Sequence, residues 1–482
     1  MLTAVMAAMG VLASPAGAAQ TSDTGSSAVG SGVPTVAPMP ADTTTVPMRR
    51  VVGKKLVDAS GQPVRLLGVD TTGTEDACVL GGKVSGWGPF DAVEAKSIAA
   101  WHTNAVRVPL NEDCWLGING APSNFSASTY RAQIRTWVAE LNAAGLVAIL
   151  DLHWSAPGAH RAAGQWPMPD ASHSVNFWGQ VAAAFKSDPS VIFDLFNEPY
   201  LGGTHPTAAD WLCWRNGCSS SQDPCAKDDQ LGCWTGTSYR VAGMQQLLDA
   251  VRASGARQPV MIGGLNWAGD PCGVKDLGGN GGSCAWLSHE PHDPDHQLLV
   301  SFHTYDWTAC ITVSCWESSV KRVARQVPVV TSEVGEKDCS DRYVDRYLQW
   351  ADRNGISYLA WSWEPPLDSA VGCVAKNLDL LSNWSGSPDP ANLVASAFKE
   401  HLAELAASHT AQSAVAGQVG RVGVRAPHLV PSIRLRGGLR LRHRCAGTIG
   451  RCDHRSHRSG RSHVGTVRRG HRRVGPPRSP HL

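Results

Sequence analysis

The stretch V-I-F-D-L-F-N-E-P at residues 191–199 begins as an apolar, β-branched run and closes on Asn197 and Glu198. A short apolar run of this kind, bounded by Pro, is typical of a strand that is buried on both faces of a parallel sheet. The stretch P-V-V-T-S-E-V-G at residues 328–335 has the same pattern and closes on Glu333. Each carboxyl is therefore expected at the end of a buried strand, where burial shifts its pKa while a ligand still reaches it.

Apolar runs of this type recur eight times along the chain and are separated by stretches of helical period. They lie at residues 64–69, 105–110, 147–152, 191–196, 259–263, 298–302, 328–331 and 356–361. Two of the intervening helices are expected at residues 130–145, with Gly145 at the end, and at 174–186. Strands that alternate with helices form a parallel sheet, and eight repeats favour closure, so the sequence predicts an α/β fold, a (β/α)8 TIM barrel. No G-x-G-x-x-G follows the first run, which argues against a dinucleotide-binding sheet.

The segments that flank the repeats are expected to complete the barrel. From residue 51 the chain alternates apolar and polar side chains around an A-S-G-Q turn at residues 59–62, the pattern of an N-terminal β-hairpin that closes the bottom of the barrel. After the last strand, S-P-D-P-A-N-L predicts a final helix with Asp389 as its cap and Pro390 as its first residue, ending near Ala406. The barrel domain is thus expected over residues 48–408.

The N-terminal residues lack the pattern of a folded domain. Residues 1–19 combine an apolar stretch too short to span a bilayer with small residues at its end, which indicates a secretory signal peptide. The usual basic start is missing, and a disordered Ala-rich terminus is the alternative. Residues 20–47 are mainly Ser, Thr, Gly, Ala and Pro, the composition of a disordered linker.

The C-terminal residues differ from the rest in charge. Residues 411–482 hold sixteen Arg, no Lys and one acid, a net charge of +15, so the remaining residues carry −13 of the overall +2. The segment has no apolar periodicity, and residues 409–482 are expected to be a disordered tail. Arg to the exclusion of Lys favours a gene read out of frame, ahead of a genuine cationic tail and of a nucleic-acid-binding arm.

The fourteen cysteines indicate disulfides and therefore an oxidising compartment. Twelve of them lie between Cys78 and Cys373, in the connections that follow the strands, so the loops are expected to be long and disulfide-pinned. Zinc is the alternative, but neither a C-x2-C pairing nor a nearby His pair supports it. Connectivity is not deducible from sequence, and local pairs are expected: Cys78 with Cys114, Cys213 with Cys218, Cys225 with Cys233, Cys272 with Cys284, Cys310 with Cys315, and Cys339 with Cys373.

Polar and aromatic residues also stand at the ends of the other predicted strands. Together with the two carboxyls they make a set of eight: Arg107, His153, Asn197, Glu198, His303, Tyr305, Glu333 and Trp361. In these motifs the chain resembles glycoside hydrolase family 5, the cellulase-like retaining enzymes, over roughly residues 51–406. The resemblance implies that Glu198 is the acid/base and Glu333 the nucleophile, and that the other six bind substrate.

Elementary chemistry assigns compatible roles to these residues. Arg107 and Tyr305 are donors suited to keeping Glu333 anionic, which leaves the raised pKa to Glu198. Asn197 is placed to bind the sugar 2-hydroxyl, the two histidines to donate to substrate or to orient the carboxylates, and Trp361 to stack on a sugar ring. Each residue taken alone is more simply explained as an ion pair, a satisfied polar group or core. The complete set on one face argues against that explanation.

Tryptophans after the strands are a further indication of sugar binding, because loop tryptophans at this face suit stacking on pyranose rings. Trp267 and Trp307 are the two expected to contact the ligand, and some of the others are expected only to pack the disulfide-pinned loops. The full set of loop tryptophans is Trp115, Trp154, Trp166, Trp211, Trp214, Trp234, Trp267, Trp286, Trp307, Trp316 and Trp363.

The sequence therefore predicts a secreted, extracellular glycoside hydrolase that cleaves β-1,4-glucosidic bonds in cellulose or related β-glucans by double displacement. A polysaccharide or oligosaccharide is the expected partner; no cofactor, metal, nucleic acid or membrane after processing is implied, and a monomer is expected. A β-mannanase or another β-glycosidase of the same fold is the first alternative. A non-catalytic carbohydrate-binding barrel and, from the Arg-rich tail, a nucleic-acid-binding protein are alternatives of other classes. Endo and exo cleavage are both open.

Overall fold

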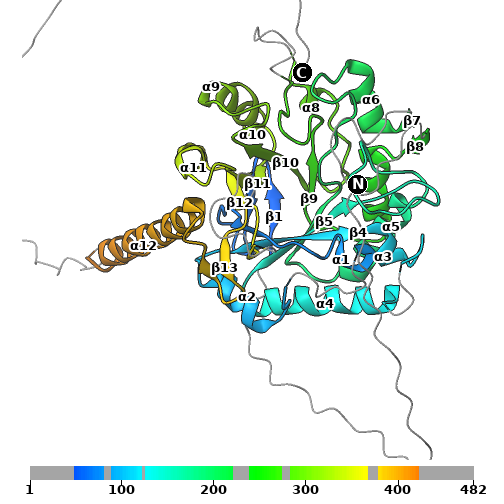
Figure 1. The fold of residues 1–482 in the computed structure, drawn as a ribbon. Helices are drawn as coiled ribbons and strands as arrows, with labels where there is room; N and C mark the ends of the chain where they lie inside the picture. Colours follow the sequence, from blue (N-terminus) through cyan, green and yellow to red (C-terminus); the bar gives the residue numbers. More distant parts are fainter. Residues whose placement is uncertain are drawn as a thin grey trace, which may run out of the picture. The chain divides into compact units, whose positions relative to one another are not determined.

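The computed structural model describes residues 48–80, 88–121, 125–220, 238–273, 283–366 and 378–422. Its centre is a closed barrel of eight parallel strands in the order β10-β11-β12-β3-β4-β5-β6-β9 (Figure 1). The closed eight-stranded barrel predicted from the repeats is confirmed. The strands are β3 (Leu67–Asp70), β4 (Ala105–Asn111), β5 (Val147–Trp154), β6 (Val191–Asp194), β9 (Val260–Gly263), β10 (Leu298–Tyr305), β11 (Val329–Gly335) and β12 (Ser357–Ala360).

Three strands extend by more than one residue beyond the apolar runs that predicted them. β5, β10 and β11 continue through polar residues as far as Trp154, Tyr305 and Gly335. The polar side chains in these extensions find partners inside the top of the barrel, so a strand does not need to end where its apolar run ends. The opposite holds for β6, which ends at Asp194 and leaves Glu198 in the loop that follows.

The N-terminal hairpin closes the bottom of the barrel as expected, with one turn more than predicted. β1 (Arg50–Val52) and β2 (Lys55–Val57) pair around Gly53, whose φ of 59° is readily adopted only by glycine. The chain then turns back at the predicted A-S-G-Q segment, and Val57 pairs with Pro63. The hairpin contributes two side chains to the lower apolar layer, which comprises Val51, Leu56, Leu66, Ala105, Val147, Ile149, Ile192, Met261, Leu299, Val330 and Leu359.

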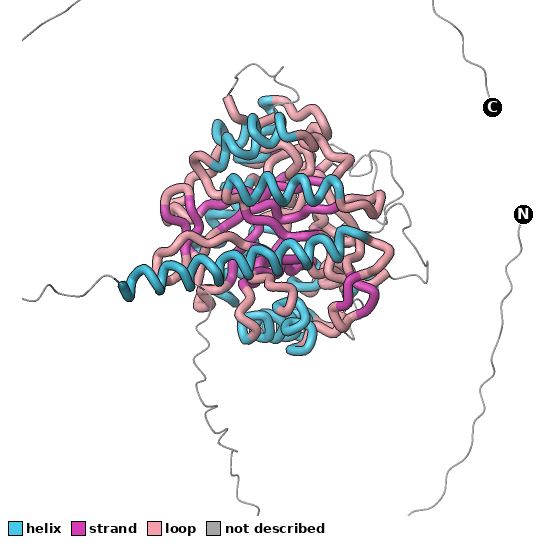
Figure 2. The backbone as a smooth tube through the Cα atoms, turned by 90° about the vertical axis from the view of Figure 1, so that its left-hand side faces the viewer, coloured by secondary structure: helices cyan, strands magenta, loops and turns pink. Residues whose placement is uncertain are grey.

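Helices surround the strands, as Figure 2 shows. The two helices predicted from periodicity are present as α4 (Ala127–Ala143), after which Gly145 has a φ of 81°, and α5 (Ser174–Phe185). The remaining helices are α1 (Ala77–Leu80), α2 (Ala92–Ala99), α3 (Glu112–Leu116), α6 (Ala208–Asn216), α7 (Met244–Ala253), α8 (Ala285–Ser288), α9 (Val313–Cys315), the π-helical turn η2 (Trp316–Val320), α10 (Lys321–Ala324), α11 (Arg342–Asn354) and α12 (Leu393–Val422). Two small antiparallel pairs lie outside the barrel: β7 (Cys218–Ser220) with β8 (Tyr239–Val241), and β13 (Leu381–Asn383) with β14 (Ser387–Pro388).

The predicted limits of the last helix are wrong at both ends. α12 begins at Leu393, and Asn392 rather than Asp389 caps its first turn. The Asn392 Oδ1 accepts a hydrogen bond from the Val394 amide at 3.1 Å. The helix continues past residue 406 to Val422. The added segment is rich in Ala and Gln, which favour helix. Residues up to Gln418 form one compact unit, and of the second unit, Val419–Leu482, the structure describes residues 419–422.

Four of the six predicted cysteine pairs are present, and each pins a connection beside the barrel. Their Cα atoms lie 6.1 Å apart for Cys78 and Cys114, 5.1 Å for Cys213 and Cys218, 4.1 Å for Cys272 and Cys284, and 5.5 Å for Cys310 and Cys315. The pairs of Cys225 with Cys233 and of Cys339 with Cys373 involve residues outside the described ranges. The expected signal peptide, the linker and the tail from residue 423 also lie outside the described ranges. No helix in the described ranges is long and apolar enough to cross a membrane.

Candidate active site

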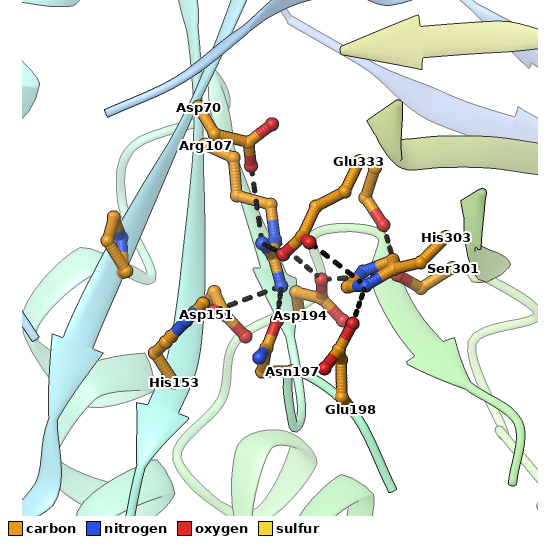
Figure 3. A network of polar contacts seen from close by, with 12 residues as sticks. Asp70, Arg107, Asp151, His153, Asp194, Asn197, Glu198, Ser301, His303 and Glu333 are labelled. Carbon is orange, nitrogen blue, oxygen red and sulfur yellow. Dashed lines mark hydrogen bonds and ion pairs between the residues drawn. The ribbon is translucent and has the colours of Figure 1, made fainter. Parts of the chain in front are cut away.

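The eight residues predicted at the strand ends all lie at the carboxyl end of the barrel, in or beside one cleft of about 620 Å³. Figure 3 shows how Arg107, His153, Asn197, Glu198, His303 and Glu333 lie relative to one another. Arg107 and His303 lie below the floor of the cleft and are fully buried. The other six line the cleft: His153, Asn197, Glu198, Tyr305, Glu333 and Trp361. Segments up to 254 residues apart in sequence therefore meet where a ligand has access, as expected for the loop face of a TM barrel.

Arg107 on β4 is the centre of the polar network. Burial works against its charge, but the surrounding carboxyls outweigh this and raise its pKa well above the usual value. Its guanidinium donates to Glu333 Oε1 at 2.7 Å and Asp70 Oδ1 at 3.2 Å from Nη1, to Asn197 Oδ1 at 2.8 Å from Nη2, and to Asp194 Oδ2 at 3.0 Å from Nε. Asp151 Oδ2 forms an ion pair with Nη2 at 3.0 Å.

Glu333 receives donors on both carboxylate oxygens. Arg107 donates to Oε1, and the Tyr305 hydroxyl donates to Oε2 at 2.6 Å. The side chain is only 5% exposed, so these two bonds, not water, hold it in place. Both donors suit an ionised carboxylate.

An irregularity in β11 explains how Glu333 comes to face inward. Its pairing with β12 shifts between Thr331 and Val334, a β-bulge. Thr331 bonds the Tyr347 hydroxyl on α11, outside the barrel, whereas Ser332 bonds Ser301 on β10 and Glu333 bonds Tyr305. Two consecutive side chains therefore point inward, which a regular strand does not allow.

Glu198 lies opposite Glu333, in the loop after β6. Its side chain is 19% exposed, and its Oε1 lies 2.8 Å from Nδ1 of His303. The Gln165 amide donates to the Glu198 backbone carbonyl at 2.7 Å and holds this loop. Burial raises the pKa of Glu198 to about 7, against the smaller opposing effects of His153 and Arg107. Glu198 is therefore suited to carry a proton near neutral pH.

Both histidines are neutral near pH 7. Burial lowers the pKa of His303 to about 3 and, together with the charge of Arg107, that of His153 to about 4. His153 Nδ1 lies 2.7 Å from Asp151 Oδ2, so its N–H is directed there and Nε2 is left as an acceptor. The His153 ring also stacks on Trp361, with centroids 5.5 Å apart and planes 15° from parallel.

The two glutamates are close together. One ligand atom from each of Glu198, His303 and Glu333 lies within 4.8 Å of the others. Within the described ranges these are also the side chains near enough to one another to hold a metal ion. A carboxyl separation of about 5 Å permits direct attack on a sugar carbon, whereas about 6.5–9.5 Å is needed to fit a water between a carboxylate and the sugar.

Aromatic side chains form the walls of the cleft. Trp267 stacks on Tyr200, with centroids 4.9 Å apart, and Trp307 stacks on Tyr305 at 4.6 Å. Both tryptophans line the cleft, and Trp307 is 45% exposed. Trp267 is the middle residue of three with positive φ, at 63°, 53° and 55°, a backbone that costs free energy at residues other than Gly and is found mainly at functional loops.

Seven of the other loop tryptophans are buried, the place expected of those that only pack the loops. They fill the space beneath the loops and do not line the cleft. They are Trp115, Trp166, Trp211, Trp214, Trp286, Trp316 and Trp363. Trp154 is partly buried against the same core, and Trp234 lies outside the described residues.

Three buried aspartates belong to the site but were not predicted from the sequence. Asp70, Asp151 and Asp194 contact Arg107 from β3, β5 and β6. A signal for them was present, since each is an acid inside or directly after an apolar run that was expected to be a buried strand. An acid in such a place requires a partner, and Arg107 is the one cation among the strand-end residues.

Comparison with known proteins finds a matching family model and relatives that align with 70–75% of this chain. A family model described as Cellulase (glycosyl hydrolase family 5) matches residues 57–366. A mannan endo-1,4-beta-mannosidase from Salipaludibacillus agaradhaerens is 22% identical over 340 residues, 70% of this chain and 86% of the relative. A β-glucanase from Saccharophagus degradans in its native form has 20% identity and a TM-score of 0.51, covering 75% of this chain and 94% of that one. The same enzyme with cellotetraose has 19% identity and a TM-score of 0.51 over the same shares.

Proposed function

The chain belongs to glycosyl hydrolase family 5, and we propose that it cleaves β-1,4-glucosidic bonds in cellulose or a related β-glucan with retention of anomeric configuration. The observation that carries this proposal is the pair of carboxyls within 4.8 Å, one of them held by two donors and the other raised in pKa. That division of roles between two neighbouring carboxyls is what double displacement requires.

In the first step Glu333 is the nucleophile. Its carboxylate oxygen attacks the anomeric carbon while the bond to the leaving oxygen breaks, and Glu198 gives its proton to that oxygen. The products are a glycosyl ester on Glu333, the released alcohol and an ionised Glu198. In the second step Glu198 takes a proton from water, the water oxygen attacks the same carbon, and Glu333 leaves as a carboxylate.

The surrounding side chains support these steps. Arg107 directs the carbonyl oxygen of Asn197 toward itself, so the Asn197 amide N–H groups are left for the sugar 2-hydroxyl. That contact strengthens as the oxocarbenium ion forms. His303 holds Glu198 beside Glu333, and Trp361, fixed by its stacking on His153, offers a flat face to the sugar ring. Because both histidines are neutral, neither competes with Glu198 as the acid at neutral pH.

Glucan is the proposed substrate because the matching family model is the one described as cellulase. Mannan is the second candidate, because the curated relative found over most of this chain is a mannanase. The two polymers differ at the sugar 2-hydroxyl, which is the group that faces Asn197 in this mechanism. We also propose that the enzyme is exported, in keeping with its disulfide-pinned loops, and that it acts as a monomer.

The test combines a substrate panel with stereochemistry. Initial rates on carboxymethylcellulose, mannan and a series of cello-oligosaccharides identify the polymer and the mode of cleavage. Proton NMR of the first product anomer reports the configuration. The proposal expects carboxymethylcellulose to be the better polymer and the β-anomer to appear first. A higher rate on mannan assigns the second candidate, and a first-formed α-anomer contradicts retention.

A further inference from the structure

Asp70 and Glu333 share one nitrogen of Arg107. Nη1 lies 2.7 Å from Glu333 Oε1 and 3.2 Å from Asp70 Oδ1, and both carboxyls are buried. Figure 3 shows the two side chains approaching the guanidinium from β3 and β11. Asp151 and Asp194 also bind Arg107, but through Nη2 and Nε. Of these three aspartates, Asp70 is therefore the one that contacts Nη1 of Arg107, the same nitrogen that Glu333, the proposed nucleophile, contacts.

One cation faces four buried carboxyls in this network, and four ionised carboxylates would leave a large uncompensated charge. Burial raises the pKa of Asp70 well above its usual range, and the negative charges of Glu333 and Asp151 raise it further, against the opposing effect of Arg107. While Glu333 is ionised, these effects favour the protonated form of Asp70. These three residues are the charged groups that act most strongly on Asp70.

The inference rests on the proposed function, because the charge of Glu333 beside Arg107 changes during that reaction. When Glu333 becomes a glycosyl ester it loses its charge, and Arg107 Nη1 loses its strongest acceptor. We infer that Asp70 is a positioning residue that then ionises and takes over Nη1 of Arg107, thereby stabilising the covalent intermediate. The proton of Asp70 passes to solvent water when the ester forms, and one returns when water cleaves the ester and Glu333 leaves as a carboxylate.

The inference is tested with a 2,4-dinitrophenyl 2-deoxy-2-fluoro-β-cellobioside, which needs no acid to release its phenolate and forms a slowly hydrolysed ester. Labelling is carried out in the Glu198→Gln variant, so that no proton comes from Glu198. A pH indicator in weak buffer then measures release per labelled enzyme. We expect about one proton in Glu198→Gln and markedly less in the double variant with Asp70→Asn. Equal release from both variants overturns the inference.

A second readout uses the enzyme with Glu198 intact. Asp70→Asn keeps the shape of the side chain but cannot ionise, so its trapped ester should be hydrolysed about tenfold faster than that of the wild type, the effect of one charge-assisted contact. Glu94→Gln is the matched control: Glu94 is a buried acid on α2 with a pKa raised to about 8, and it does not contact Arg107. Its ester should have the wild-type lifetime.

The outcomes separate this inference from the proposed function. If the wild type forms no ester on Glu333, the retaining mechanism itself is contradicted. If the ester forms but its lifetime and the proton release do not depend on Asp70, the mechanism stands and the role of Asp70 is refuted. If Asp70→Asn is not recovered folded, proton release from Glu198→Gln alone still decides, because a value near zero refutes the inference.

Discussion

Replacing Tyr305 by Phe isolates one contact to the proposed nucleophile. The Tyr305 hydroxyl donates to Glu333 Oε2 at 2.6 Å, while the ring stacks on Trp307. Phe keeps the ring and its stacking and removes only the hydroxyl. Without it, Oε2 keeps a contact with His303 Nδ1 at 3.3 Å. The carboxylate is then held by Arg107 through Oε1 and is free to rotate about that contact.

The magnitude follows from the kind of bond that is lost. A hydrogen bond from a neutral hydroxyl to a buried carboxylate contributes about 2 kcal/mol, which corresponds to about a 30-fold change in rate. We therefore expect kcat/KM of Tyr305→Phe on an aryl β-cellobioside to fall about 30-fold, mainly through kcat because the substrate-binding walls are unchanged. Steady-state kinetics at pH 6 measure this, with Tm recorded by circular dichroism to establish that the variant is folded.

Tyr347→Phe is the matched control. Its hydroxyl also bonds a β11 side chain, Thr331, but on the outer side of the barrel. Loss of this buried bond should lower Tm and leave kcat/KM unchanged. The reasoning is refuted if Tyr305→Phe keeps kcat/KM within about twofold of the wild type, or if the control loses as much activity as Tyr305→Phe.

Three further predictions concern pH, the walls of the cleft and the loops. Because Glu198 must be protonated for the first step and its pKa is raised to about 7, kcat/KM should be high below pH 7 and fall as pH rises through that value; Glu198→Gln should abolish this basic limb on a dinitrophenyl substrate. Trp307→Ala should raise KM about fivefold for cello-oligosaccharides that reach it and leave KM for a short aryl glycoside nearly unchanged, since stacking on this exposed ring contributes about 1 kcal/mol. Replacing Cys272 and Cys284 by Ala should lower the free energy of unfolding in urea by about 3 kcal/mol, the entropy of the loop they close, and equal stability would show that the pair does not constrain the unfolded chain.

The barrel was predictable because its strands are continuous apolar runs at regular intervals, a pattern set by burial on both faces. The eight site residues were found because they stand where those runs end. The structure brings their side chains together, while their roles remain proposals. The hairpin was likewise predictable from its alternation, since Val51 and Leu56 face the lower layer of the core.

Other features depend on contacts between distant segments and were missed or misjudged. Asp70, Asp151 and Asp194 acquire their role only because three strands converge on Arg107. The inward turn of Glu333 beside Ser332 depends on a bulge that the sequence does not mark. Which of the other loop tryptophans only pack the loops could not be predicted, because a loop position says nothing about whether the loop folds back on the barrel.

The central claim is that Glu333 attacks the sugar directly. It is tested by treating the enzyme with 2,4-dinitrophenyl 2-deoxy-2-fluoro-β-cellobioside and locating the bound sugar by peptide mass spectrometry. The account predicts one release of dinitrophenolate per enzyme and one label, on the peptide that contains Glu333. A label on Glu198 instead, or continued turnover without any covalent adduct, would contradict it.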